Sequence, residues 1–288
     1  MQERWENFPG ATGVTAPPVP EVATAGHNSL WKRILSAVVL AIPVIVCVSI
    51  GSPWIEALVV VVALVLVWEW CRLCSKTFSY RDSALLAAVI TAAILTVAFD
   101  HAFAAILVLV VGGIAIHLLT GGHVWLSVGA LYIGLPCVAV IWLRSDPVLG
   151  RETLFWLLAL VWASDVGGYV FGRLIGGRKL APTWSPNKTW AGFAGAAACA
   201  ALVGAATALI MKGASFWPLV GLSALLGAAT QGGDLFESWV KRHFGVKDTS
   251  GLIPGHGGLF DRVDGLLAAS VLTALLGVVG NGSVLKWI

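Results

Sequence analysis

Charged residues are concentrated in one short stretch of an otherwise apolar sequence, SWVKRHFGVKDTSGLIPGHGGLFDRVD, at residues 238–264. With Asp234 and Glu237 just before it, the stretch holds five carboxylates and four Lys or Arg residues. Ionisable groups are costly in lipid, so these side chains must face water, a ligand or metal ions. Carboxylates suit a hard cation such as Mg²⁺, and Lys and Arg suit phosphate groups. This combination is typical of phosphoryl or nucleotidyl transfer.

The spacing of the acids predicts that two helix ends converge. Asp261 and Asp264 lie three residues apart, so on a helix they share one face where the last apolar segment begins. Asp234 and Lys241 belong to a set with the same spacing at the end of the preceding apolar segment. We expect Asp234 and Asp261 to be the leading ligands of a Mg²⁺ ion, with Asp264 and Asp165 next. This many carboxylates would also suffice for a second cation.

A second polar stretch covers residues 164–192 and begins inside an apolar segment with Asp165. Arg173 and Lys188 follow among several glycines. These bases fit either phosphate binding or the anchoring of a membrane protein by positive cytoplasmic loops. Residues 185–189 form a polar turn that leads into a helix, where side chains and backbone N–H groups can contact phosphate.

The composition predicts an all-α, polytopic integral membrane protein. Of the 288 residues, 58% are hydrophobic and only 11% are charged, against about 25% charged residues in soluble domains. The net charge of +3, without a basic tract, argues against a nucleic-acid partner. Because a helix needs about 20 apolar residues to cross a bilayer, we expect about nine transmembrane helices. They are placed near 33–51, 54–72, 83–99, 102–119, 124–143, 152–171, 190–211, 216–233 and 264–280.

Three regions follow from this pattern: a flexible tail at 1–28, N-terminal transmembrane helices at 29–150, and a C-terminal transmembrane catalytic region at 151–288. Basic loops fall on one side if the count is nine, which predicts that the N-terminus and both charged stretches face the cytoplasm. The Ala- and Gly-rich segment 190–211 predicts either close helix packing or the face of a homodimer.

Two features of the segment 54–72 and its end have competing interpretations. Glu69 lies near a predicted cytoplasmic helix end, where it is either an interfacial acid or part of a site. Cys71 and Cys74 form a CxxC pair without a second cysteine pair or a histidine cluster. Helix-end packing is therefore the default for the two thiols, and a metal or redox role is the alternative.

The stretch 238–264 resembles the signature of the phosphatidate cytidylyltransferases, the CDP-diacylglycerol synthases. That signature runs from a Ser and Lys-Arg, through Lys-Asp and His-Gly-Gly, to Asp-Arg-apolar-Asp. The matching residues are Ser238, Val240, Lys241, Arg242, Lys247, Asp248, Ser250, Ile253, Pro254, His256, Gly257, Gly258, Leu259, Asp261, Arg262, Val263 and Asp264.

The stretch 164–192 resembles a second block of the same family, Asp…Gly-Arg…Ser-Pro-Lys-Lys-Thr-x-Glu-Gly. Two positions depart from it, because Asn187 replaces a Lys and Ala191 stands where the family usually has Glu. The N-terminal half is similar only in being apolar. The matching residues are Asp165, Tyr169, Gly172, Arg173, Ser185, Pro186, Lys188, Thr189 and Gly192.

The resemblance implies an enzyme of the inner, or plasma, membrane that converts CTP and phosphatidate into CDP-diacylglycerol and pyrophosphate. A related enzyme for an archaeol-type or polyprenyl phosphate is the nearer alternative, and an ion-coupled transporter the more distant one. The implied catalytic residues are Asp234, Asp261, Asp264, Lys241, Arg242, His256 and Arg262. The implied substrate-binding residues are Arg173, Ser185, Lys188, Thr189, Lys247 and Asp248.

Overall fold

The computed structural model describes residues 39–74, 79–211, 214–253, 257–280 and 282–286. Long apolar runs make these residues almost entirely helical, because a backbone in lipid must satisfy its hydrogen bonds internally. In the described part of the chain the long helices are Val39–Ile50, α2 (Trp54–Cys74), α3 (Tyr80–Ala98), α4 (Ala102–Leu119), α5 (Val124–Ser145), α6 (Gly150–Leu174), α7 (Trp190–Ile210), α8 (Phe216–His243) and α9 (Phe260–Val279).

This architecture confirms the predicted all-α membrane fold. Seven of the described helices, α2 to α7 and α9, are long and apolar enough to cross a membrane. The helix Val39–Ile50 is shorter within the described residues, and α8 carries the polar residues of the charged stretch. All nine coincide with predicted spans, although α8 continues to His243, well beyond the predicted end at 233. The predicted division after residue 150 falls at the first residue of α6 and stays a prediction.

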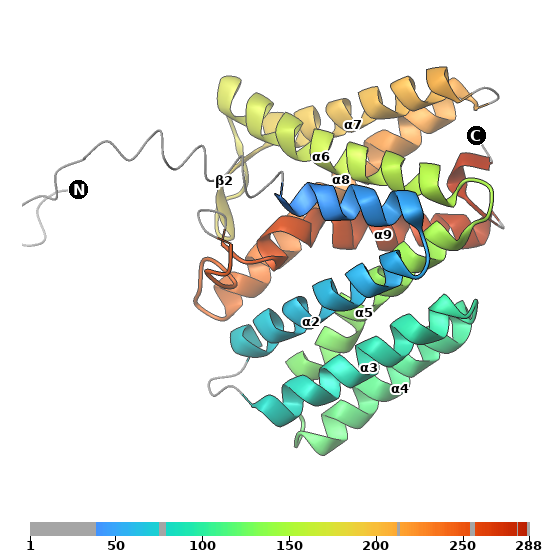
Figure 1. Cartoon of the computed structure of the whole chain (residues 1–288). Coiled ribbons are helices and arrows are strands. Elements are labelled where there is room, and N and C mark those ends of the chain that lie inside the picture. Colours follow the sequence, from blue (N-terminus) through green and yellow to red (C-terminus); the bar gives the residue numbers. More distant parts are fainter. Residues whose placement is uncertain (1–38, 75–78, 212–213, 254–256, 281, 287–288) are drawn as a thin grey trace, which may run out of the picture.

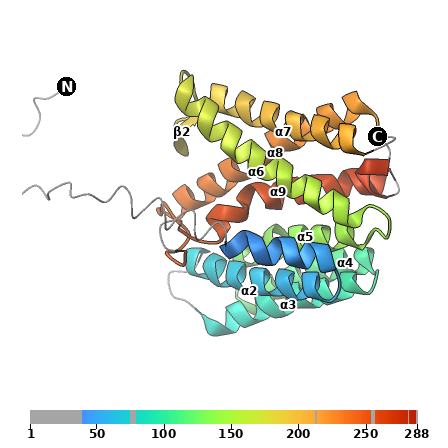
Figure 2. The ribbon, with the colours of Figure 1, turned by 45° about the horizontal axis from the view of Figure 1, so that its top comes forward.

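The helices form two groups that pack side by side (Figures 1 and 2). In the first group, α5 contacts α2, α3 and α4. In the second group, α7 packs between α6 and α8, and α8 also contacts α9. Contacts of α5 with α9 and α6 join the groups, so a site on α8 and α9 lies next to the N-terminal half.

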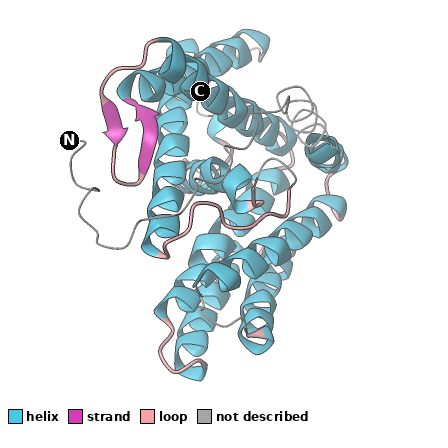
Figure 3. Ribbon diagram, turned by 90° about the vertical axis from the view of Figure 1, so that its left-hand side faces the viewer, coloured by secondary structure: helices cyan, strands magenta, loops and turns pink. Residues whose placement is uncertain are grey.

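A short hairpin connects α6 to α7 at one end of the helices (Figure 3). Strand β1 (Lys179–Ala181) pairs antiparallel with β2 (Ser185–Thr189). Thr189 then ends the strand and caps α7, since its side chain accepts a hydrogen bond from the N–H of Gly192 at 3.1 Å. The polar stretch predicted as a turn before a helix is thus a hairpin whose last residue starts that helix.

Helices α6 and α7 approach closely because glycines line their contact. A Cβ atom added at Gly192 would lie 2.7 Å from the carbonyl oxygen of Gly168. One added at Gly195 would lie 2.5 Å from Cβ of Phe171. The predicted close packing of segment 190–211 is therefore confirmed within the chain, and the homodimer face stays a prediction.

Candidate active site

A polar cavity of about 700 Å³ opens between α6, β2, α7, α8 and α9. It brings together residues that are up to 99 positions apart in the sequence, from Asp165 to Asp264. The charged residues on its wall are Asp165, Arg173, Lys188, Asp234, Asp261, Arg262 and Asp264. Both polar stretches of the sequence thus contribute to one site.

Three acids form a compact cluster, and two of them, Asp234 and Asp264, line this cavity. Asp234, Glu237 and Asp264 each present one carboxylate oxygen, and these three oxygens lie within 4.8 Å of one another. Oxygen Oε1 of the buried Glu237 has no hydrogen-bond partner among the described residues. Three converging carboxylates, one with an oxygen left over, fit a hard divalent cation.

Two lysines compensate the charge of this cluster. The Nζ atom of Lys188 lies 2.6 Å from Oδ2 of Asp234 and donates to Oε1 of Gln231 at 3.0 Å. The Nζ atom of Lys241 lies 2.6 Å from both Oε2 of Glu237 and Oδ1 of Asp261. Lys188 comes from β2 and Lys241 from α8, so the hairpin and the helix both hold the acids in place.

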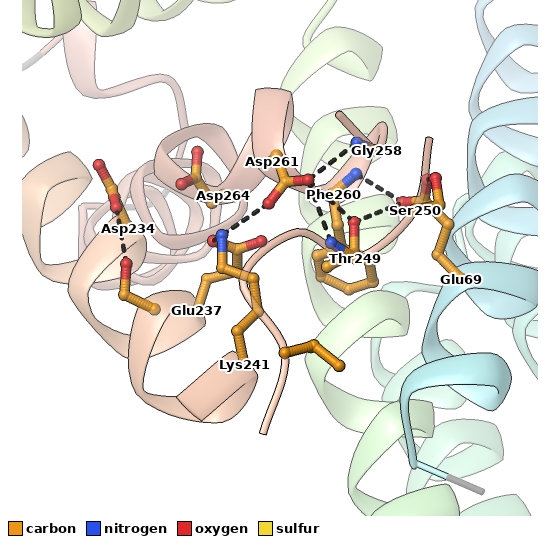
Figure 4. A network of polar contacts seen from close by, with 12 residues as sticks. Glu69, Asp234, Glu237, Lys241, Thr249, Ser250, Gly258, Phe260, Asp261 and Asp264 are labelled. Carbon is orange, nitrogen blue, oxygen red and sulfur yellow. Dashed lines mark hydrogen bonds and ion pairs between the residues drawn. The ribbon is translucent and has the colours of Figure 1, made fainter. Parts of the chain in front are cut away.

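Asp261 has its carboxylate oxygens occupied by protein groups (Figure 4). Its Oδ1 pairs with Lys241, while Oδ2 accepts from the N–H of Gly258 at 2.8 Å and from Oγ1 of Thr249 at 3.1 Å. It lines the cavity outside the three-acid cluster, and so does Asp165. The geometry therefore favours Asp261 as an organiser of the loop before α9, and its role as a metal ligand stays a prediction.

The compact acid cluster contains Glu237 and not Asp261. The sequence prediction did not include Glu237 among the metal ligands. Its spacing carried the signal, since it lies three residues after Asp234 and four before Lys241. On α8 this spacing places the three side chains on one face. In sequence, Glu237 four residues before Lys241 resembles an ordinary helix ion pair, so the carboxylate of Asp264 from α9 was needed to recognise a candidate metal site.

The remaining predicted site residues divide into those at the cavity and those around it. Arg173 lines the cavity and donates to the Tyr169 hydroxyl at 2.8 Å. Arg242 lies outside the wall and donates to the carbonyl oxygens of Trp184 at 3.3 Å and Val246 at 3.0 Å. Thr189 lines the cavity, whereas the wall does not include Ser185, Lys247 or Asp248. His256 lies outside the described residues.

A second, mostly apolar cavity of about 520 Å³ shares one wall residue with the polar one. Side chains of α5, α8 and α9 line it, among them Leu131, Phe236 and Leu267. Asp264 lies on the walls of both cavities. A charged compartment and an apolar one therefore lie on either side of Asp264 in the helical part of the molecule.

These features define a class of protein: a polytopic membrane protein whose helices enclose a site with acids that could hold a cation and bases that could bind phosphate. The chain belongs to the cytidylyltransferase family, whose model matches residues 31–279. The protein is therefore a nucleotidyltransferase of the membrane.

Several relatives share the name phosphatidate cytidylyltransferase. The protein of Brucella suis is 38% identical over 257 residues, which cover 88% of this chain and 94% of the relative. The protein of Mycobacterium leprae is 46% identical over 126 residues, which cover 44% of this chain and 40% of the relative. The protein of Mycobacterium tuberculosis strain H37Rv is 45% identical over 125 residues, which cover 43% and 38%.

Proposed function

We propose that this protein transfers the cytidylyl group of CTP to phosphatidate, giving CDP-diacylglycerol and pyrophosphate. Membership of the cytidylyltransferase family and the names of its relatives support the reaction. The observation that carries the lipid assignment is that Asp264 lies on the wall of both the polar and the apolar cavity. A lipid phosphate needs this pairing, because its headgroup is anionic and its acyl chains are apolar.

The reaction requires no nucleophile from the protein. An oxygen of the phosphatidate phosphate attacks the α-phosphorus of CTP, the bond from that phosphorus to the oxygen bridging the β-phosphate breaks, and pyrophosphate leaves. The protein must position two anions that repel each other and neutralise their charge. Arg173, Lys188 and Arg262 on the cavity wall suit this task, since guanidinium and ammonium groups bind phosphate oxygens.

Asp234, Glu237 and Asp264 would hold Mg²⁺ at this site, with Asp165 and Asp261 as candidates for a second cation. The spacing of the cluster and the unpartnered oxygen of Glu237 support this assignment. When bound, the cation supplies positive charge beside the phosphate oxygens of the substrates. Lys241 keeps Glu237 and Asp261 oriented from the other side of the cluster.

Measuring product formation with a panel of acceptors tests the substrate assignment. Purified protein in detergent is incubated with labelled CTP, Mg²⁺ and either phosphatidate, an archaeol-type phosphate or a polyprenyl phosphate. We expect labelled lipid and pyrophosphate in equal amounts, with the highest kcat/KM for phosphatidate. A higher kcat/KM for another acceptor would replace phosphatidate as the substrate, and no transfer to any acceptor would reject the function.

We also propose that the protein lies in the inner membrane and that its polar cavity opens to the cytoplasm. The support is the basic hairpin and the basic end of α8, which adjoin the cavity. In intact cells an impermeant thiol reagent should leave Thr183→Cys in the hairpin unlabelled. The same reagent should label Val148→Cys in the α5–α6 connection, where Val148 is exposed. The reverse labelling pattern would invert the topology and place the site away from CTP.

A further inference from the structure

Glu69 of α2 is a fully buried acid from the N-terminal half of the chain, with 0% of its surface exposed. A carboxylate at such a position is costly unless its oxygens accept hydrogen bonds. Both oxygens do, and all of their donors in the described residues belong to the charged stretch about 180–191 positions later in the chain.

The first contact is with the start of α9. The backbone N–H of Leu259 donates to Oε1 of Glu69 at 2.8 Å, and the N–H of Phe260 donates to Oε2 at 2.7 Å. The first N–H groups of a helix have no partners within the helix, and Leu259 offers no capping side chain. Glu69 therefore caps α9 from a different helix, and its negative charge also suits the positive end of the α9 dipole.

The second contact is with the loop between α8 and α9. The Ser250 hydroxyl donates to Oε1 of Glu69 at 2.5 Å, and the Thr249 hydroxyl lies 3.4 Å from Oε2. Thr249 also contacts Oδ2 of Asp261 at 3.1 Å, so one threonine bridges the two carboxylates. Residue 258 must be a glycine at this close approach, because a Cβ atom there would lie only 2.6 Å from Oε1 of Glu69.

The packing around Phe260 reinforces this attachment. The Phe260 ring is buried against Trp70 of α2, with centroids 5.8 Å apart, and stacks on Tyr132 of α5 at 5.5 Å. The start of α9 is thus fixed by hydrogen bonds and by apolar contacts at once. Asp261 and Asp264 lie one and four residues beyond Phe260, so the position of both acids follows from this attachment.

We propose that Glu69 is a positioning residue for the reaction: it fixes the start of α9 so that Asp261 and Asp264 face the acids of α8. The proposal rests on the proposed function, and it concerns a fully buried residue that does not line the cavity. It assigns the N-terminal helices a specific part in building the site.

The test compares Glu69→Gln with Glu56→Gln, a matched control at the opposite end of α2. The amide keeps the volume of Glu69 but offers one acceptor oxygen where two are used. In detergent, folded protein is quantified by size-exclusion chromatography, Mn²⁺ binding to the free enzyme by electron paramagnetic resonance, and kcat and KM for CTP by product formation. Thr249→Val is a second variant, which removes the bridge to Asp261 but leaves the cap of α9 in place.

Per folded molecule, Glu69→Gln should weaken Mn²⁺ binding and lower kcat, each by about 10- to 100-fold. The KM for CTP should stay within about twofold, because the cavity bases are untouched. Thr249→Val should show a smaller loss of the same kind, and Glu56→Gln should match the native protein. If Glu69→Gln does not fold, Glu69→Asp takes its place, because it keeps the carboxylate but withdraws it from the N–H groups at the start of α9.

Native Mn²⁺ affinity and native kcat in the folded fraction of both the Glu69 variant and Thr249→Val would overturn the proposal. Glu69 would then have a purely structural role. An equal loss in Glu56→Gln would also overturn it, because the effect would then belong to α2 in general. Failure of the proposed function is distinguishable, since a native protein without transferase activity still allows the Mn²⁺ comparison.

Discussion

The two helix groups of this protein differ in where they place polar residues. In α2 to α5 the membrane-spanning windows have mean hydropathies between 1.6 and 2.6, and among the described residues Glu69 is the acid that bonds to the start of α9. In α6 to α9, acids and bases from three helices and a hairpin converge on one cavity. On the proposed assignment, the C-terminal group carries the chemistry, and the N-terminal group supports it through the buried Glu69.

The largest expected effect is the loss of an acid of the cluster. Asp234→Asn and Asp264→Asn keep size but remove a charge, so each should lower the rate by about 10²-fold or more. Folded yield should change little, because removing one acid relieves repulsion in the metal-free cluster. Product formation and monodisperse yield in detergent are measured for each variant, with the exposed Asp100→Asn as control.

Normal activity in both cluster variants would remove the cluster from the site. Lost activity with a collapsed yield would move these acids to a structural role. Either result would break the contrast between a catalytic and a supporting helix group.

A moderate effect is expected from glycine substitutions that test how each group packs. Gly192→Ala in α7 would bring Cβ against the backbone oxygen of Gly168, which cannot move away, so it should destabilise the protein by about 1–3 kcal/mol. Gly134→Ala in α5 would meet the end of the Leu109 side chain, which can rotate, and should cost less. Gly221→Ala in α8 meets nothing within 4 Å and is the neutral control.

Unfolding of the three variants in detergent gives the comparison. An equal loss of unfolding free energy in Gly192→Ala and Gly134→Ala would show that both helix groups accommodate an added methyl group equally well. The α6–α7 contact would then not be the more rigid one.

The smallest effect concerns the connection between the groups at the opposite end of the helices. Burial raises the pKa of Asp146, but hydrogen bonds from Lys286 and from the N–H groups of Leu149 and Val148 outweigh it and lower the pKa to about 2. A lowered pKa stabilises the fold above the unfolded value of about 3.9, and this stabilisation is lost as the pH falls towards 2.

Lys286→Met should therefore cost at most about 1 kcal/mol at pH 7, because the pair is partly exposed. The difference from the native protein should vanish near pH 2. Thermal unfolding at several pH values measures it, and a difference that does not change with pH would contradict the assignment to Asp146.

The helices could be predicted from sequence because apolar runs of about 20 residues leave few alternatives. The polar ends of the helices were harder to predict. Helix α8 continues past residue 233 because its polar side chains find partners in the folded protein, as Lys241 does in Asp261. The hairpin at 179–189 is too short for an alternating pattern. The contact of Glu69 with Phe260 spans 191 positions, a distance at which spacing carries no information.

Part of the predicted set from the two polar stretches lines the cavity, including Asp165, Lys188 and Asp264, whereas Ser185, Lys247 and Asp248 do not. Residue types and helical spacing were enough for that part. Which acid completes the cluster depended on how α8 faces α9, and therefore on packing between segments that the sequence separates.

The most direct test of the acid cluster is the divalent-cation dependence of CDP-diacylglycerol formation by the native protein and by Glu237→Gln. The native activity should vanish in EDTA and return with Mg²⁺ or Mn²⁺, because the three carboxylates are proposed to hold the cation. Glu237→Gln should stay folded and lose about 10²-fold in rate at saturating Mg²⁺. Full native activity in the strict absence of divalent ions, or a native rate in Glu237→Gln, would contradict the account.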